Sequence, residues 1–286
     1  MRVLVAGALG LVGWELLPIL RDKGNEVRAK DLPFFDLRYR DSVRNQILQF
    51  RPDWVVNLAA FTAVDDCETN VDAARQANSK GALHIAEAAN EAGARLLQVS
   101  TDYVYDGTKP DSYTEEDEPS PLSEYGRSKL EGEAAVRASL PEGRWLIVRG
   151  QSLYGFGRKS FPDAILKAAE SSKQIPVVVD QTVSPTWARE FARGLEALIR
   201  ADARGLYLLS SSGSCTWNEF ARAVIDMAGV QGVEVTETTA EALGRPARRP
   251  ARSVFALDKF VSTTGVSPPH WRDQLQAYLR ETWRAA

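Results

Sequence analysis

The sequence predicts an α/β protein: a Rossmann-type, doubly wound parallel sheet followed by a smaller C-terminal α/β lobe. In the first half of the 286-residue chain, short apolar or β-branched runs alternate with polar amphipathic stretches, which is typical of βαβ units. The first run leads directly into a glycine turn that opens a helical stretch. After Gly150 the alternation becomes irregular. We therefore expect residues 1–150 to form the sheet unit and residues 151–286 to form the smaller lobe. The chain could also cross from one unit to the other and back.

Five runs are expected to form the strands of the sheet, because buried parallel strands read as nearly continuous apolar stretches. They are Arg2–Ala6, Glu26–Ala29, Trp54–Leu58, Arg95–Ser100 and Trp145–Arg149. The helical stretches between them end near glycine, proline or a polar break. They are Leu11–Lys23, Arg40–Phe50, Val71–Ala92 and Tyr125–Ala138. The second half predicts helices at Phe161–Ser171, Ala188–Arg200 and Trp271–Arg284, and strands at Ile175–Val179 and Leu206–Leu209.

Composition and charge exclude several classes of protein. The 35 basic and 38 acidic residues leave a formal charge of -3, so no chain-wide basic field exists to hold a nucleic acid polymer. No apolar run reaches the ~18 residues of a membrane span, and the N-terminus lacks the pattern of a secretory signal. Cys67 and Cys215 lie far apart without metal-ligand spacing, which fits a reducing compartment. We expect a cytoplasmic protein, monomeric or homodimeric, with no membrane partner.

The first strand runs into a G-x-x-G-x-x-G turn at residues 7–13, directly before the first helical stretch. Glycines let the backbone turn tightly and approach a pyrophosphate, whose charge then meets the helix N-terminus. The position between strand and helix favours a dinucleotide site over a glycine turn without a ligand. The residues expected to contact the cofactor here are Gly7, Leu9, Gly10, Leu11, Val12 and Gly13.

Asp31 follows the second strand, about where a carboxylate would accept the adenosine ribose hydroxyls of NAD. Nearby Arg28 and Lys30 could instead meet the 2′-phosphate of NADP, so both NADH and NADPH stay open as cofactors. A solvated loop charge is the other interpretation of Asp31. At the end of the third strand, small side chains are expected to let the cofactor lie against the sheet edge. The residues there are Leu58, Ala59 and Ala60.

Candidate catalytic residues follow the fourth strand, at the edge where open α/β sheets place their chemistry. Thr101 comes at the strand end, while Tyr125 and Lys129 share one helix face because they are four residues apart. A nearby ammonium favours the phenolate, so Lys129 is expected to bring the pKa of Tyr125 toward neutral pH. The hydroxyl of Thr101 or of Ser100 would hold the substrate oxygen by a hydrogen bond during hydride transfer. The alternative is an exposed tyrosine beside a solvated lysine, but the order of the three motifs favours catalysis.

Three stretches give the chain a strong resemblance to a known family: residues 56–65 (VNLAAFTAVD), 100–107 (STDYVYDG) and 125–133 (YGRSKLEGE). The chain resembles the extended short-chain dehydrogenase/reductases and, within them, the dTDP-4-dehydrorhamnose reductases over nearly its whole length. The resemblance implies reduction of the C4 ketone of a nucleotide-linked 6-deoxy-4-ketohexose by NAD(P)H, with dTDP-4-dehydrorhamnose as the expected substrate, in polysaccharide synthesis. Thr101, Tyr125 and Lys129 would be the catalytic trio, with Tyr125 as proton donor and Lys129 holding the nicotinamide ribose.

The same resemblance implies that the smaller lobe binds the substrate and that a set of residues contacts it. These residues are Thr62, Val64, Asp102, Tyr103, Ser152, Arg249 and Arg252. Ser152 stands where the family usually has a tryptophan, and Tyr103 where the related sugar dehydratases have a glutamate, which favours simple reduction. The arginines of residues 245–252 would either clamp a diphosphate or form a solvated basic loop.

Three other functions stay open at this point. The protein could be an epimerase, a reductase of a different keto-sugar nucleotide, or a non-catalytic NADP-binding subunit resembling the regulatory subunit of methionine adenosyltransferase. Some bacterial members of the family dimerise around a magnesium ion held by acidic residues, and Glu15 resembles one such ligand. Its partners have no match in the sequence, so we assign no metal-binding residues.

Overall fold

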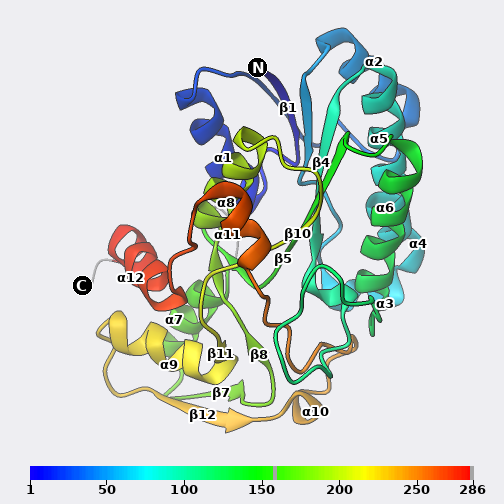
Figure 1. Ribbon diagram of the computed structural model, residues 1–286. Coiled ribbons are helices and arrows are strands. Elements are labelled where there is room, and N and C mark those ends of the chain that lie inside the picture. Colours follow the sequence, from blue (N-terminus) through cyan, green and yellow to red (C-terminus); the bar gives the residue numbers. More distant parts are fainter. Residues whose placement is uncertain (157–159, 284–286) are drawn as a thin grey trace.

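The computed structural model describes residues 1–156 and 160–283, and a six-stranded sheet lies at its centre (Figure 1). The strand order is β10-β5-β4-β3-β1-β2, and every neighbouring pair is parallel. The strands are β1 (Arg2–Ala6), β2 (Glu26–Lys30), β3 (Trp54–Asn57), β4 (Arg95–Thr101), β5 (Trp145–Gly150) and β10 (Gly205–Leu209). The order reverses between β1 and β3, and open α/β sheets bind ligands beyond the strand ends at such a point.

Helices cover both faces of this sheet (Figure 1). On one face lie α1 (Leu11–Asp22), α8 (Ala188–Arg200) and α11 (Asp258–Thr264). The other face carries α2 (Arg40–Phe50), α5 (Gly81–Glu91) and α6 (Glu124–Ser139). Each helix layer encloses a buried apolar core, around Leu16 and Phe191 on the first face and around Val43 and Ile85 on the second. Both faces of the sheet are therefore closed to solvent, as its nearly continuous apolar strands require.

A smaller lobe has its own core around Phe220 and Tyr278, and Figure 1 shows it beneath the sheet. Its helices are α7 (Phe161–Ser171), α9 (Trp217–Met227), α10 (Ala240–Leu243) and α12 (Trp271–Thr282). Its strands pair two by two. They are β6 (Leu153–Tyr154), β7 (Gln174–Val178), β8 (Thr182–Val183), β9 (Thr186–Trp187), β11 (Cys215–Thr216) and β12 (Glu234–Thr238).

The predicted fold class is confirmed, and the five predicted sheet strands end within one residue of the observed ones. The strand predicted at Leu206–Leu209 lies in the central sheet beside β5, so the chain passes between the two units. A boundary at residue 150 stays a prediction. Arg284, the predicted end of the last helix, lies outside the described residues. None of the helices in the described part of the chain is long and apolar enough to cross a bilayer.

The long helix predicted at Val71–Ala92 is present with a local change of pitch. The segments α4 (Val71–Arg75) and α5 flank a π-helical turn at Gln76–Lys80. Within that turn, the Asn78 side chain donates to the Phe61 carbonyl at 3.1 Å and to the Ser128 hydroxyl at 2.9 Å. The wider turn thus ties the loop after β3 to α6, and such turns recur at functional sites.

Candidate active site

The glycine turn lies against the end of β3. Gly7 has a φ of 76°, which glycine tolerates, and a Cβ atom added there would lie 2.6 Å from the main-chain nitrogen of Ala59. Gly10 is the N-cap of α1, and no side chain caps that helix. The amides of its first turn, at Leu11, Val12 and Gly13, are therefore available to an anion. The turn and the strand end that were predicted to share one cofactor are in contact.

The carboxylate of Asp31 fastens the glycine turn. Its Oδ2 accepts a hydrogen bond from the Leu9 amide at 2.7 Å. The two cations predicted to compete for the cofactor are held against α2, Arg28 by a cation–π contact at 4.3 Å and Lys30 by a hydrogen bond at 2.5 Å. Asp31 therefore has a structural role, and the ribose contact predicted for it stays a prediction.

Helix α6 carries Tyr125 and Lys129 into the interior of the site. Ser123 caps the helix by accepting a hydrogen bond from the Gly126 amide at 3.2 Å. A Cβ atom added at Gly126 would lie 2.1 Å from the Tyr103 carbonyl oxygen, so only glycine lets α6 pack this closely against the 3₁₀ turn η2 (Asp102–Val104). Tyr125 and Lys129 are both buried. This burial excludes the alternative in which both side chains are solvated.

Thr101 ends β4 and bridges two groups of the site. Its Oγ1 accepts a hydrogen bond from the Tyr103 amide at 3.2 Å and donates one to the Asp102 carboxylate at 3.1 Å. The same hydroxyl lies within hydrogen-bonding reach of the Tyr125 phenol. Asp102 is 3% exposed, and burial raises its pKa to about 6, although hydrogen bonds with Ser253 and Thr101 oppose the rise. A buried carboxyl that titrates near neutral pH thus stands one hydroxyl away from Tyr125.

The electrostatics of Tyr125 differ from the prediction. Burial raises the pKa of Tyr125, the charge of Asp102 adds to the rise, and the hydrogen bond with Thr101 opposes it. Burial lowers the pKa of Lys129 to about 8, and the Lys129 ammonium donates to the Val99 carbonyl at 2.7 Å. The prediction that Lys129 brings the pKa of Tyr125 toward neutrality is wrong, because the cost of burying the phenolate is larger. Tyr125 keeps its proton at neutral pH, which suits a proton donor.

On the side of the site predicted to bind substrate, Arg249 is held by other protein groups. It makes a bidentate ion pair with Asp65 at 3.0 and 2.9 Å, and its guanidinium lies within hydrogen-bonding reach of the Tyr103 hydroxyl. The Tyr103 ring in turn lies edge-on to that of Tyr125, with 5.5 Å between ring centroids. The contact predicted between Arg249 and a diphosphate stays a prediction. Sequence reasoning did not single out Asp65, since only its distant partner makes it part of the site.

The other residues predicted to contact substrate surround this group. Val64 begins α3 (Val64–Thr69) and packs beside Tyr125, while Thr62 is exposed in the loop before α3. Arg252 is half-buried, and its Nε has no hydrogen-bond partner among the described residues. Ser152 has a φ of 49°, which is uncommon for a residue with a Cβ atom and recurs at functional sites.

Gln151 joins the two units behind Asp102, and sequence reasoning missed it. Its Oε1 accepts hydrogen bonds from the Ser184 amide at 3.0 Å and from the Ser253 hydroxyl at 3.5 Å. The Ser253 hydroxyl also lies within hydrogen-bonding reach of the Asp102 carboxyl group. No local motif marks these residues, because they come from separate segments of the chain that only the fold brings together.

The residues around Glu15 do not fit the magnesium site that the family resemblance raised. Glu15 lies on α1, and its Oε2 accepts a hydrogen bond from Arg189 Nε at 2.9 Å. The other end of the Arg189 guanidinium bonds the Glu281 carboxylate of α12 at 2.6 and 2.8 Å. A permanent positive charge therefore lies between the two carboxylates. Within residues 1–156 and 160–283, no group of three or more acidic, histidine or cysteine side chains is arranged to hold a metal ion.

Comparisons with known proteins agree with this geometry. A family model described as the RmlD substrate binding domain matches residues 1–283. The spore coat polysaccharide biosynthesis protein SpsK of Bacillus subtilis is 38% identical over 282 residues, which cover 98% of this chain and 97% of that protein. The dTDP-4-dehydrorhamnose reductase of Sinorhizobium fredii is 36% identical over 283 residues, with 96% and 95% covered.

Solved structures show the same relationship. The crystal structure of the dTDP-4-dehydrorhamnose reductase of Bacillus anthracis in complex with NADP superposes with a TM-score of 0.94 at 32% identity. The match covers 98% of this chain and 99% of that one. The resemblance predicted from the three sequence stretches is confirmed, and the chain belongs to the RmlD substrate-binding-domain family.

Proposed function

We propose that this protein reduces the C4 ketone of dTDP-4-dehydrorhamnose to dTDP-rhamnose, with NADPH as the hydride donor. One observation carries the proposal: a hydroxyl, a neutral phenol and an ammonium, those of Thr101, Tyr125 and Lys129, are buried together at the end of β4. The name of the Sinorhizobium relative supports the substrate, and the NADP complex of the Bacillus anthracis relative supports NADPH over NADH.

The mechanism follows from the tasks of these residues at the substrate carbonyl. Bound NADPH supplies the hydride that the carbonyl carbon accepts. Tyr125 donates its phenolic proton to the oxygen as this oxygen becomes an alkoxide, and Thr101 donates a hydrogen bond to the same oxygen. Lys129 binds the nicotinamide ribose, and its positive charge stabilises the phenolate that remains on Tyr125.

The rest of the chain binds the two reactants. We assign the cofactor to the sheet unit, where the glycine turn and the first amides of α1 hold the pyrophosphate. We assign the sugar nucleotide to the smaller lobe and to the Asp65–Arg249 pair beside it. The two buried thiols, Cys67 and Cys215, support a reducing compartment and therefore the cytoplasm as the place of reaction.

A reductase of a different keto-sugar nucleotide is the second candidate, and one observation favours it. Ser152 replaces the tryptophan usual in the family, and it follows Gln151, whose carboxamide is buried behind Asp102. A serine fills far less volume than an indole ring and brings a hydroxyl. The sugar pocket would therefore be larger and more polar than in relatives with tryptophan.

The test supplies NADPH or NADH together with dTDP-4-dehydrorhamnose made in place by the preceding enzymes. The readouts are loss of nicotinamide absorbance and chromatographic identification of the product. Stoichiometric oxidation with dTDP-rhamnose as product is expected. Oxidation only with another keto-sugar nucleotide would support the second candidate. Sugar conversion without net oxidation would indicate an epimerase, and tight NADPH binding without any turnover would indicate a non-catalytic subunit.

A further inference from the structure

A buried acid lies one helical turn beyond the proposed ribose-binding lysine. Glu133 follows Lys129 by four residues on α6, and both side chains are buried. A lysine and a glutamate at this spacing lie on one helix face and ordinarily attract each other. Burial strengthens that attraction, because the protein interior screens charge less than water does. Such a pair would turn the Lys129 ammonium away from the cofactor.

A second cation binds the Glu133 carboxylate instead. Arg149 on β5 binds the Glu133 carboxylate through Nε at 2.9 Å and through Nη2 at 2.7 Å, and each of the two side chains is only 1% exposed. Arg149 is held in turn by the Tyr105 hydroxyl at 2.7 Å. Lys129 instead donates to the Val99 carbonyl at 2.7 Å, at the end of the sheet.

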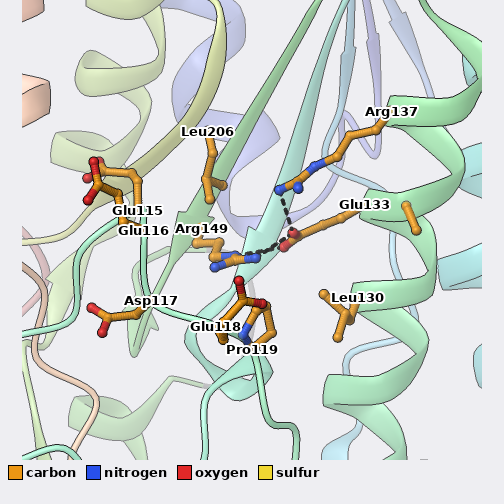
Figure 2. A pocket seen from close by; sticks show the side chains of 11 residues that line it. Glu115, Glu116, Asp117, Glu118, Pro119, Leu130, Glu133, Arg137, Arg149 and Leu206 are labelled. Carbon is orange, nitrogen blue, oxygen red and sulfur yellow. Dashed lines mark hydrogen bonds and ion pairs between the residues drawn. The ribbon is translucent and has the colours of Figure 1, made fainter.

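Figure 2 shows how this pair is enclosed. Arg149 and Glu133 point toward each other in a pocket of about 190 Å³ that the loop of Glu115, Glu116, Asp117 and Glu118 also lines. Arg137 reaches the same Glu133 carboxylate at a longer distance, 3.6 Å, and is itself 44% exposed. The bidentate pair with Arg149 is therefore the tight contact of Glu133, and the contact with Arg137 is peripheral.

We propose that Arg149 and Glu133 are positioning residues for the reduction: Arg149 occupies the Glu133 carboxylate and so leaves the Lys129 ammonium free to bind the cofactor ribose. This inference rests on the proposed function. Glu133 has the complementary effect, because its negative charge attracts two buried cations, Lys129 and Arg149, and offsets both. The pair acts on the reaction through Lys129 and touches neither the reacting carbon nor its oxygen.

Charged and titratable groups around Lys129 lie on α6 itself, on β5 and on η2. Glu133 is on the same helix, and its charge raises the pKa of Lys129 against the larger effect of burial, which lowers it to about 8. Arg149 on β5 stands behind Glu133. Asp102 and Tyr103 lie on η2, and Tyr125 is one turn before Lys129. Arg149 and Glu133 can be changed together without altering the proton donor Tyr125.

The test measures the dissociation constant of NADPH by fluorescence between about pH 6 and pH 9, the range that brackets the pKa of Lys129. Arg149→Met frees Glu133 to pair with Lys129, so NADPH binding weakens about tenfold, within the coupling found inside one ion-pair network. Glu133→Gln removes the negative charge that the two cations share, so Lys129 loses its proton at a lower pH than in the wild type. NADPH binding should therefore weaken at a lower pH as well. The double variant removes both charges and regains most of the affinity and the wild-type pH profile.

Two controls keep the result specific. Arg137→Met removes only the peripheral contact and should leave NADPH binding and its pH profile unchanged. Thermal unfolding reports which variants fold. If Arg149→Met does not, Arg149→Lys is used instead; a lysine keeps the charge but cannot make the bidentate contact, so a smaller loss of NADPH affinity is expected. Two results together overturn the inference. The double variant binds NADPH as weakly as the weaker single variant, and the pH dependence of NADPH binding in Glu133→Gln is the same as in the wild type. Wild-type protein that fails to bind NADPH at all overturns the proposed function as well.

Discussion

The two sides of the site are built in different ways. On the cofactor side, main-chain atoms make the surface: a glycine turn, the first amides of α1 and the end of β3 pressed against Gly7. On the side toward the smaller lobe, side chains make it: the Asp102 carboxyl group lies within hydrogen-bonding reach of Ser253, and Asp65 makes an ion pair with Arg249. A backbone surface recognises what all dinucleotides share, whereas a side-chain surface can change its ligand by substitution. We therefore expect the first side to determine the class of cofactor and the second side to determine the choice of substrate.

The largest effect that separates the two sides is expected from Tyr125→Phe. The ring and its edge-on packing against Tyr103 remain, but the phenolic proton is lost. Turnover should fall about 10²- to 10⁴-fold, the contribution of a positioned general acid. NADPH affinity should stay within about twofold of the wild type, because the backbone surface is untouched. Steady-state kinetics and fluorescence titration measure the two, and near-normal turnover would remove Tyr125 from the mechanism.

Gly7→Ala tests the backbone side. The substitution places a Cβ atom 2.6 Å from the Ala59 nitrogen at a φ of 76°. Steric strain and overpacking together should lower the free energy of unfolding by about 3 kcal/mol and weaken NADPH binding.

Gly93→Ala is the matched control, since Gly93 has a φ of 74° but no neighbouring atom within 4 Å of the added Cβ. It should cost only about 1 kcal/mol and leave NADPH binding unchanged. Urea denaturation of both variants measures the difference. Equal losses of stability would mean that the contact between the turn and β3 contributes nothing.

Asp102→Asn probes the side-chain surface through pH. The pKa of Asp102 in the folded protein, about 6, lies above its ordinary value of 3.8, so the folded state holds this proton more tightly than the unfolded state does. The contribution of the Asp102 proton to the free energy of unfolding of the wild type is therefore fully present below about pH 4, and it is lost as the pH rises through about 6. The asparagine variant should be more stable than the wild type by about 1–2 kcal/mol at pH 7.5, and by less at pH 5. An equal difference at both pH values would exclude titration of Asp102 in this range.

The backbone side of the site could be predicted from the sequence better than the side-chain side. The glycine turn, the strand ends and the spacing of Tyr125 and Lys129 are local patterns, and the structure has them where the sequence placed them. Asp65 and Arg249 are 184 residues apart, and Gln151 and Ser253 are 102 apart, so no local pattern pairs them. The error on the pKa of Tyr125 has the same origin, because spacing shows the nearby ammonium but not the burial that outweighs it.

The smallest effect is expected at Asp31, whose carboxylate accepts a hydrogen bond from the main chain of the glycine turn and so forms part of the backbone surface. Asp31→Ala removes both the acceptor of the Leu9 amide and the carboxylate charge, so it should weaken NADH binding by about threefold to tenfold and NADPH binding by less. Asp31→Asn keeps an acceptor for Leu9 but removes the charge that would repel a 2′-phosphate, so it should leave overall affinity near that of the wild type and raise the preference for NADPH. Dissociation constants for both cofactors, measured on both variants, separate the two roles. If the ratio of the constants is the same in the wild type and the asparagine variant, Asp31 serves the turn alone, and cofactor preference must come from side chains such as Arg28 and Lys30 that α2 holds nearby.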